Sequence, residues 1–252
     1  MLTEINSLSW QDIEEMNLSD ACYVLPIASL EQHGRHLPAG TDDFILRFLL
    51  DRLKEDKRIT AAMLLLPAIH YGSSREHLAF PGTVSLSSAT IVSIIDDVLF
   101  SLKAGNVKKL IILNSHGGNT ALLNACIKEW KQKFGLSVFA LNLWDSPFFD
   151  GVQPLIETPT SLDIHAGEIE TSILLEAMPA AVHRDRIPGA DCLVKLKPYG
   201  DGWFSADLSP GNGVLGAPGK ASPEKGKKLL QYCVDRIVEY FLEILMICPV
   251  IL

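Results

Sequence analysis

Short, nearly continuous apolar runs alternate along the chain with longer segments in which apolar residues recur at helical spacing. Four runs predict strands buried on both faces, as in a parallel sheet: residues 21–29, 63–69, 107–115 and 136–144. Helices are expected between and after them, over residues 43–57, 88–104, 119–134, 168–178 and 222–247. This alternation predicts an α/β fold with three layers, α/β/α, around a mostly parallel central sheet.

The chain is long enough for one sizeable core, with 252 residues of which 48% are hydrophobic. No linker or internal repeat divides it, so we expect a single domain over residues 1–252. One stretch, residues 197–223, is rich in glycine and proline and carries Trp203 and Phe204. Loops of this length in compact domains are usually functional. We therefore expect an active-site cover or a subunit contact rather than an inert surface loop.

The formal net charge of -8 and the lack of an extended basic stretch argue against nucleic acid or a membrane surface as partner. Five cysteines are scattered without a CxxC pair, which favours a reducing compartment over disulfides or a thiolate metal site. The first residues lack the basic and apolar regions of a signal peptide. A cytoplasmic location and a small-molecule substrate are expected.

The segment EQHGRHLPAGTDD, residues 31–43, gathers ionisable side chains directly after the first predicted strand: Glu31, His33, His36, Asp42 and Asp43. In open α/β sheets, ligands bind just beyond the carboxyl ends of the strands. Carboxylates and imidazoles together suit zinc, manganese or ferrous iron. A polar turn that caps the next helix is the alternative. It accounts for Thr41 and Asp42, but not for the whole cluster.

Two further segments add candidate ligands. NSHGGN, residues 114–119, follows the third predicted strand, and its glycines allow a tight turn that would bring His116 to the same crevice. DIHAGEIETS, residues 163–172, places Glu168 in the first turn of a helix and His165 three residues earlier. Each has an ordinary structural explanation alone: a turn histidine, or an acid favoured by the helix dipole. Beside residues 31–43, they become candidates for one site.

Two more residues are candidate substrate contacts. His77, in the loop of residues 72–86, is expected to line the substrate site, whereas Glu76 beside it favours an ion pair or a subunit contact. Trp203 is the second candidate, from the long loop of residues 197–223.

Five segments, in order and at workable spacings, resemble the creatininase (creatinine amidohydrolase) family: EQHGRHLPAGTD, REHLAFPGTVSL, NSHGGN, HAGEIETS and GVLGAPGKASPEKGKKLL. One such string would be weak support, but five in order are specific. The resemblance spans most of the chain. It implies a creatininase-type α/β/α fold, a centre of two divalent metal ions, and a homo-oligomer that is commonly a hexamer.

The resemblance also implies roles for individual residues. Glu31, Asp42 and His116 would hold one metal ion. His33 would hold the second ion, with Asp42 bridging the two. Creatininase takes a further ligand from a glutamate two residues after the histidine of its NSHGGN-like segment.

That position is Gly118 in this chain, so Glu168 is expected to supply the missing carboxylate. By the same resemblance, His165 matches the proton-transfer histidine, and His36 is expected to support the site without binding metal.

This resemblance predicts a reaction as well as a site. Two cations about 3.5–4 Å apart can hold a bridging hydroxide and polarise a carbonyl oxygen. Zinc is the expected metal, with manganese or iron as alternatives. The expected reaction is hydrolysis of a non-peptide C–N bond, in a cyclic amide or formamide, with His165 as general acid/base. Creatinine itself is not expected, because residues 161–164 lack the tryptophan and the adjacent glutamate that creatininase carries there.

Four alternatives remain open from the sequence. Three are hydrolases with the same centre: a formylamino-pyrimidine deformylase, a mycofactocin-type peptidase and a cyclic-ketone hydrolase. The fourth is a metal- or ligand-binding protein without catalytic activity.

Overall fold

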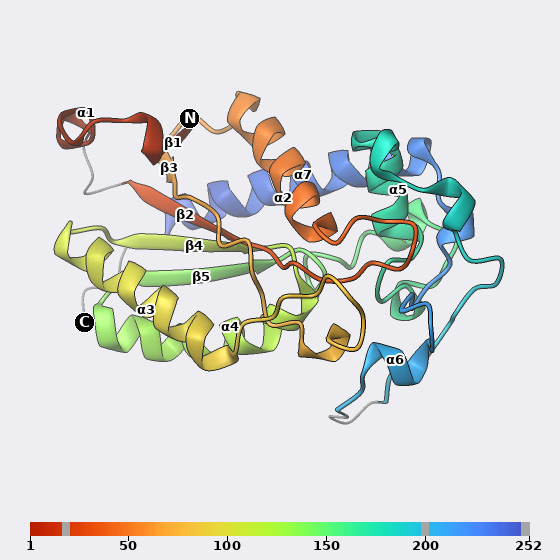
Figure 1. Cartoon of the computed structure of the whole chain (residues 1–252). Coiled ribbons are helices and arrows are strands. Elements are labelled where there is room, and N and C mark those ends of the chain that lie inside the picture. Colours follow the sequence, from red (N-terminus) through yellow and green to blue (C-terminus); the bar gives the residue numbers. More distant parts are fainter. Residues whose placement is uncertain (17–20, 198–201, 248–252) are drawn as a thin grey trace.

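A five-stranded, all-parallel sheet forms the centre of the molecule in a computed structural model that describes residues 1–16, 21–197 and 202–247. The strand order is β1-β3-β2-β4-β5. The strands are β1 (Leu2–Glu4), β2 (Cys22–Ile27), β3 (Met63–Leu65), β4 (Lys109–Asn114) and β5 (Ser137–Asn142). Helices cover both faces of this sheet (Figure 1). The predicted three-layer α/β/α fold is confirmed.

Two apolar clusters join the layers. Buried side chains of α2 (Thr41–Glu55), α5 (Glu168–Ala177) and α7 (Pro223–Met246) belong to one cluster. Those of α3 (Ser88–Ala104) and α4 (Gly117–Phe134) belong to the other. In Figure 1, α2 and α7 lie on one side of the sheet, and α3 and α4 on the other. Among the described residues, no helix is long and apolar enough to cross a membrane.

The structure adds elements that the pattern of the sequence did not predict. β1 has only three residues, which pair with β3 at the edge of the sheet. The six-residue helix α1 (Trp10–Glu15) begins with a capping box between Ser9 and Asp12. The four-residue helix α6 (Ser205–Leu208) lies inside the loop that was expected to be irregular. Segments this short contain too few positions for a hydrophobic period to appear.

The order of the strands creates a crevice at one edge of the sheet. From β2, the chain crosses to β3 on one side of β2 through α2, and then to β4 on the other side through α3. This reversal of direction is the topological switch point, where ligands bind in open α/β sheets. β2 and β4 pair in register from Cys22–Lys109 to Ile27–Asn114, so the two strands end side by side.

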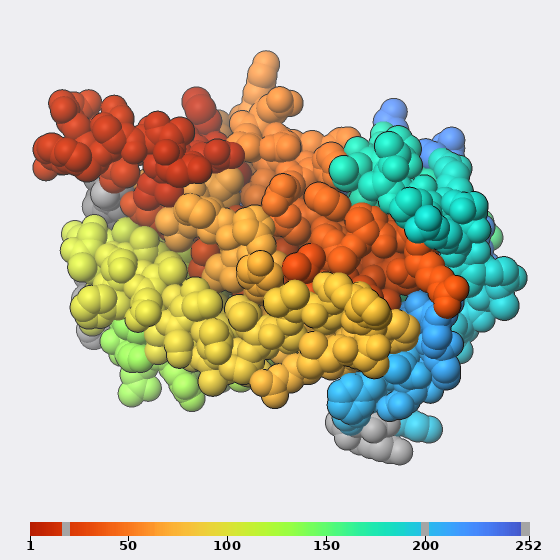
Figure 2. Space-filling view, viewed as in Figure 1, coloured from red at the N-terminus to blue at the C-terminus, as the bar shows by residue number. Residues whose placement is uncertain are grey.

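The described part of the long loop, residues 202–223, packs back on this edge. The hydroxyl of Ser205 in α6 donates to the carbonyl of Glu76 at 3.0 Å. Leu215 forms a bridge with His165, exchanging backbone hydrogen bonds in both directions at 3.0 and 2.8 Å. In Figure 2, the blue segment around α6 lies beside the amber segment that precedes α3. Residues 198–201, which belong to the predicted loop of residues 197–223, lie outside the described residues.

Candidate active site

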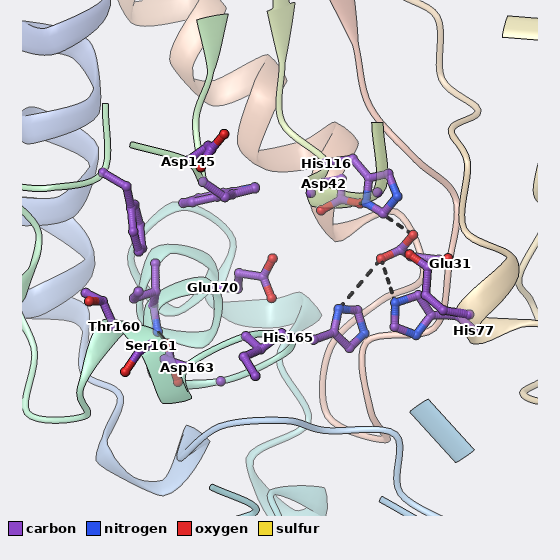
Figure 3. A pocket seen from close by; sticks show the side chains of 18 of the residues that line it. Glu31, Asp42, His77, His116, Asp145, Thr160, Ser161, Asp163, His165 and Glu170 are labelled. Carbon is purple, nitrogen blue, oxygen red and sulfur yellow. Dashed lines mark hydrogen bonds and ion pairs between the residues drawn. The ribbon is translucent and has the colours of Figure 1, made fainter. Parts of the chain in front are cut away.

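Six ionisable side chains meet at the carboxyl edge of the sheet. Glu31 and His33 follow β2, Asp42 lies in the first turn of α2, and His116 follows β4. His165 lies just before α5 and Glu170 lies on that helix. Figure 3 shows five of these six side chains, with Glu31 between His116, His165 and His77. Five of the six are at most 6% exposed: Glu31, His33, Asp42, His116 and His165.

These side chains form groups that could each hold a metal ion. Glu31, Asp42 and His116 make one group, and within it the candidate ligand atoms lie within 4.8 Å of one another. His33, Asp42 and Glu170 make a second group on the same criterion, so Asp42 is shared by both. A third combination joins Glu31 and His33 to His165. The structure thus brings together four of the five predicted ligands.

Backbone carbonyls fix which nitrogen of each imidazole faces the cluster. Nδ1 of His33 donates to the carbonyl of Glu31 at 3.1 Å, and Nε2 of His116 donates to that of Ser73 at 2.9 Å. The opposite nitrogens point at carboxylates: His33 Nε2 lies 3.5 Å from Asp42 Oδ1, and His116 Nδ1 lies 3.2 Å from Asp42 Oδ2. In neutral rings these nitrogens are lone pairs that face anionic oxygens. Metal-binding imidazoles are commonly held in this way by their second nitrogen.

The unsatisfied polar atoms of the cluster fit a cation. His33 Nε2 and Asp42 Oδ2 are buried, and neither has a hydrogen-bond partner among the described residues. Burial opposes protonation of His116, but the Glu31 and Asp42 carboxylates outweigh it and raise the pKa of His116 to about 10. Burial also raises the pKa of Glu31 to about 7. Buried charges are costly unless they are paired or coordinate a metal. Three carboxylates and two imidazoles therefore suit a centre for zinc, manganese or iron.

The structure does not bring Glu168 to the cluster. Its carboxylate turns away from the cluster and accepts hydrogen bonds from the backbone N–H groups of Glu157 (3.0 Å) and Thr158 (2.7 Å), and it pairs with Lys225. The carboxylate that reaches the cluster belongs to Glu170, whose Oε1 lies 3.7 Å from His33 Nε2. Two residues that are two positions apart on a helix are separated by a rotation of about 200° around its axis, so they point to nearly opposite sides. Only one of the two acids can therefore face the sheet edge.

Two features explain why the carboxylate comes from α5. A Cβ added at Gly118 would lie 2.2 Å from the carbonyl oxygen of Ser73, so no side chain fits at that position without a backbone shift. At the start of α5, the Asp163 carboxylate accepts from the N–H groups of Glu168 (2.7 Å) and Ile169 (2.9 Å). This cap fixes the first turn of the helix. The signal that could have identified Glu170 from the sequence is the second acid of HAGEIETS, two residues after Glu168.

The other two predicted residues of the first segment lie outside the metal-binding groups. Asp43 points away from the cluster and binds His70 Nδ1 and Arg47, each at 2.6 Å. His36 is fully buried, and its Nε2 contacts Thr171 Oγ1 on α5 at 2.9 Å. His36 therefore ties the segment to the helix that carries Glu170, as a supporting residue would.

His165 lies beside the cluster with one nitrogen free. Its Nε2 is 2.7 Å from the carbonyl oxygen of Gln32, and its Nδ1 is 3.6 Å from Glu31 Oε1. The ring stacks on His77 with centroids 4.1 Å apart. Burial, and then the neighbouring His77 and His33 rings, hold the pKa of His165 well below its usual value. The imidazole is therefore neutral at physiological pH, with a lone pair on one of its two nitrogens.

A cavity of about 900 Å³ opens onto the cluster and extends to a wall formed by Trp144, Asp145 and Phe149. Figure 3 looks into it. His77 and Trp203 both line this cavity, and their rings lie 6.3 Å apart. Several carboxylates line it, and among the described lining residues there is no lysine or arginine. The cavity thus favours groups that donate hydrogen bonds or carry positive charge.

The family model for creatinine amidohydrolase, creatininase, matches residues 6–241 of this chain. The chain belongs to the creatininase family. The creatinine amidohydrolase of Pseudomonas putida is 29% identical to it, over 93% of this chain and 94% of the relative. A mycofactocin precursor peptide peptidase of Mycobacterium tuberculosis is 32% identical, over 85% of this chain and 82% of the relative. Members with these names are hydrolases, and this creatininase-family chain is a hydrolase too.

Solved structures agree with this assignment. A single-residue variant of creatininase superposes with a TM-score of 0.80 at 26% identity, covering 97% of this chain and 99% of that one. The creatininase fold predicted from the sequence is therefore confirmed.

Proposed function

We propose that this creatininase-family hydrolase opens a non-peptide C–N bond, in a cyclic amide or formamide, at a centre of two divalent metal ions. The observation that carries the proposal is that two ligand groups share Asp42. His165, a neutral histidine, lies next to them and belongs to neither group. One ion would be held by Glu31, Asp42 and His116. The other would be held by His33, Asp42 and Glu170. Zinc is the metal we propose first, with manganese or iron as alternatives.

When bound, such ions lower the pKa of water to about 7 and polarise a substrate carbonyl. The chain's own contribution is to move the proton. Nδ1 of His165 accepts it from the attacking water and gives it to the nitrogen that leaves. His77 and Trp203 line the cavity above this centre and would hold the substrate.

The nature of the cavity bears on the substrate. A substrate rich in N–H groups matches the carboxylates of the wall, as amides and formamides do. The volume of about 900 Å³ also leaves room for a molecule larger than a small cyclic amide. A peptide is therefore the second candidate substrate, and the identity to a peptidase relative favours it.

One experiment tests the proposed function directly. The protein is stripped with a chelator, reloaded separately with zinc, manganese or iron, and assayed on cyclic amides, formamides, lactones, cyclic ketones and short peptides. We expect hydrolysis of a cyclic amide or formamide that disappears on stripping and returns with about two equivalents of metal. Turnover of peptides alone would replace the leading substrate with the second. Equal turnover with and without metal would overturn the proposal.

Glu170→Gln is expected to lose about one equivalent of metal, because the second group is left with His33 and Asp42 alone. Glu168→Gln is the matched control on the same helix. It should keep its metal but unfold at lower temperature, since Glu168 is fully buried and pairs with Lys225. Metal analysis of the folded fraction of both variants checks this. Metal loss in Glu168→Gln but not in Glu170→Gln would contradict the structure.

We also propose a single domain that acts in the cytoplasm on a small molecule, as a homo-oligomer. Large exposed apolar side chains such as Trp10 (75% exposed) and Phe100 (68%) support a contact between copies. Light scattering of the purified protein tests the assembly, and a monomer at micromolar concentration would contradict it.

A further inference from the structure

We propose that Asp163 is a positioning residue for the second metal-binding group. It holds the turn before α5, so that the backbone of Ala166 orients the Glu170 carboxylate towards His33. The consequence for metal binding rests on the proposed function. The structural basis lies in the hydrogen bonds and backbone angles of residues 163–170.

The two oxygens of the Glu170 carboxylate have different partners. Oε2 accepts a hydrogen bond from the backbone N–H of Ala166 at 2.6 Å, whereas Oε1 lies 3.7 Å from Nε2 of His33. This His33 nitrogen has no hydrogen-bond partner among the described residues. Because the backbone holds one oxygen, the other is left to face the cluster. A ligand that is oriented in advance loses less conformational entropy when it binds an ion.

The donor residue, Ala166, has an unusual backbone conformation. Its φ is +52°, in the left-handed region that residues with a Cβ rarely adopt. His165, just before it, exchanges backbone hydrogen bonds with Leu215 at 3.0 and 2.8 Å, and α5 begins at Glu168. The chain must therefore change direction within Ala166 and Gly167. A strained conformation of this kind persists only where the surrounding structure holds it.

Asp163 supplies contacts that hold this turn. Its Oδ1 accepts from the N–H of Glu168 at 2.7 Å, and its Oδ2 accepts from the N–H of Ile169 at 2.9 Å. One side chain thus joins the segment before the turn to the first turn of the helix after it. A Cβ added at Gly167 would collide with Oδ1, and one added at Gly216 would lie 2.5 Å from the same oxygen. The carboxylate therefore occupies a closed space that two glycines leave open.

Asp163 also lines the cavity, so a direct contact with the substrate is the alternative role. Both of its oxygens already accept from the backbone of α5, and Oδ1 also accepts from the N–H of Ala217 at 3.4 Å. In Figure 3, Asp163 lies at the edge of the labelled side chains, away from Glu31 and Asp42. We therefore expect Asp163 to act through Glu170 and not on the substrate.

The test compares zinc binding by the unaltered chain, Asp163→Ala and Ser87→Ala. Ser87 is the matched control, because its hydroxyl caps α3 by accepting from the N–H of Thr90 at 3.1 Å. α3 contributes no residue to the metal-binding groups described above. Each protein is stripped of metal, and the affinity of each zinc equivalent is measured by titration against a competing chelator. The unfolding temperature is measured on the same samples.

In Asp163→Ala, we expect one zinc equivalent to bind roughly tenfold to a hundredfold more weakly, the usual cost of losing a residue that orients a ligand. The other equivalent, held by Glu31, Asp42 and His116, should keep its affinity within about threefold, since none of its ligands lies on α5. A general loss of structure would weaken both equivalents together. Ser87→Ala should unfold at a lower temperature but bind both equivalents as the unaltered chain does.

Ala166→Gly, added to Asp163→Ala, tests the route through the turn. Glycine adopts the left-handed conformation without the steric cost that a Cβ imposes. The replacement also leaves the backbone donor to Glu170 in place. The double variant should therefore recover at least about threefold of the lost zinc affinity. No recovery would show that Asp163 does not act by holding the strained turn.

Asp163→Asn is used if Asp163→Ala does not fold. It keeps the shape of the side chain but sets an amide N–H against one of the two backbone donors. The same zinc equivalent should be weakened, by a smaller factor than in Asp163→Ala.

Three results would overturn the inference: equal weakening of both equivalents in Asp163→Ala, unchanged affinities in the Asp163 variants, or the same selective loss in Ser87→Ala. The structural part has a separate readout in the metal-free protein. Exchange of the Ala166 amide hydrogen should be at least about tenfold faster in Asp163→Ala, and an unchanged rate would also contradict the inference. If the unaltered protein bound zinc but hydrolysed none of the substrates, the proposed function would fail, while the zinc titrations would still decide the role of Asp163.

Discussion

Asp42→Ala is expected to abolish turnover and to remove at least one equivalent of bound metal. Asp42 belongs to both ligand groups, and its carboxylate lies against His33 on one side and His116 on the other. Burial opposes ionisation of Asp42, but these two imidazoles outweigh it and hold its pKa below the usual value. Without Asp42, one group would keep only Glu31 and His116, and the other only His33 and Glu170. Neither group would then have the carboxylate that both share. Metal analysis and kcat/KM of the folded protein measure the effect.

Asp43→Ala is the matched control, because Asp43 is the next residue on the same helix turn and is also buried. Its carboxylate binds His70 and Arg47 instead of the cluster, so the variant should keep its metal and most of its activity. If Asp43→Ala lost metal and Asp42→Ala did not, the two side chains would have exchanged roles and the ligand groups would be wrong.

His165→Ala is expected to keep both metal ions and to lower kcat/KM roughly 10²–10⁴-fold, the usual contribution of a positioned general acid–base. Each tenfold loss corresponds to about 1.36 kcal/mol of transition-state stabilisation. The reason is geometric. His165 reaches Glu31 through Nδ1 at 3.6 Å but lies outside the two groups that share Asp42. It can therefore take and return a proton without being bound to metal.

His70→Ala is the control for removing an imidazole nearby, since His70 contacts Asp43 and its side chain is half exposed. It should retain normal activity per folded molecule. His165 also belongs to the third group of candidate ligands, with Glu31 and His33. Loss of metal from His165→Ala would make it a ligand instead of a proton carrier. Full activity after correction for the folded fraction, with metal unchanged, would show that it has neither role.

The source of the second carboxylate distinguishes this chain from the pattern first expected of its family. The position two residues after His116 is a glycine whose added Cβ would meet the carbonyl of Ser73, the His116 ring and the Glu76 carboxylate. Glu170 instead approaches His33 from α5, from the opposite side of the crevice. In this chain, α5 therefore supplies the carboxylate of the second candidate metal-binding group.

The sequence by itself determined the buried strands and the segments that carry the chemistry. β2 and the centre of β4, residues 110–113, are apolar runs with no exposed position, so their hydrophobicity alone marked them as inner strands. Because each run changes abruptly to polar residues, the sequence also located the strand ends where Glu31 and His116 lie. Parallel strands end at one edge, which made the meeting of these two residues predictable without coordinates.

The tertiary structure alone decided which face of a helix meets that edge and which groups complete the site. Both Glu168 and Glu170 fall in the first turn of α5, and the Asp163 cap together with packing of the helix against α2 and α7 fixes which of them turns inward. Gln32 gave no signal, because its side chain contacts Gly213, His77 and His165, which are distant in the sequence. The edge strand β1 is specified by its partner β3 more than by its own three residues. Local patterns record burial and strand ends, whereas the rotation of a helix and a hydrogen-bond network depend on contacts that form only in the folded chain.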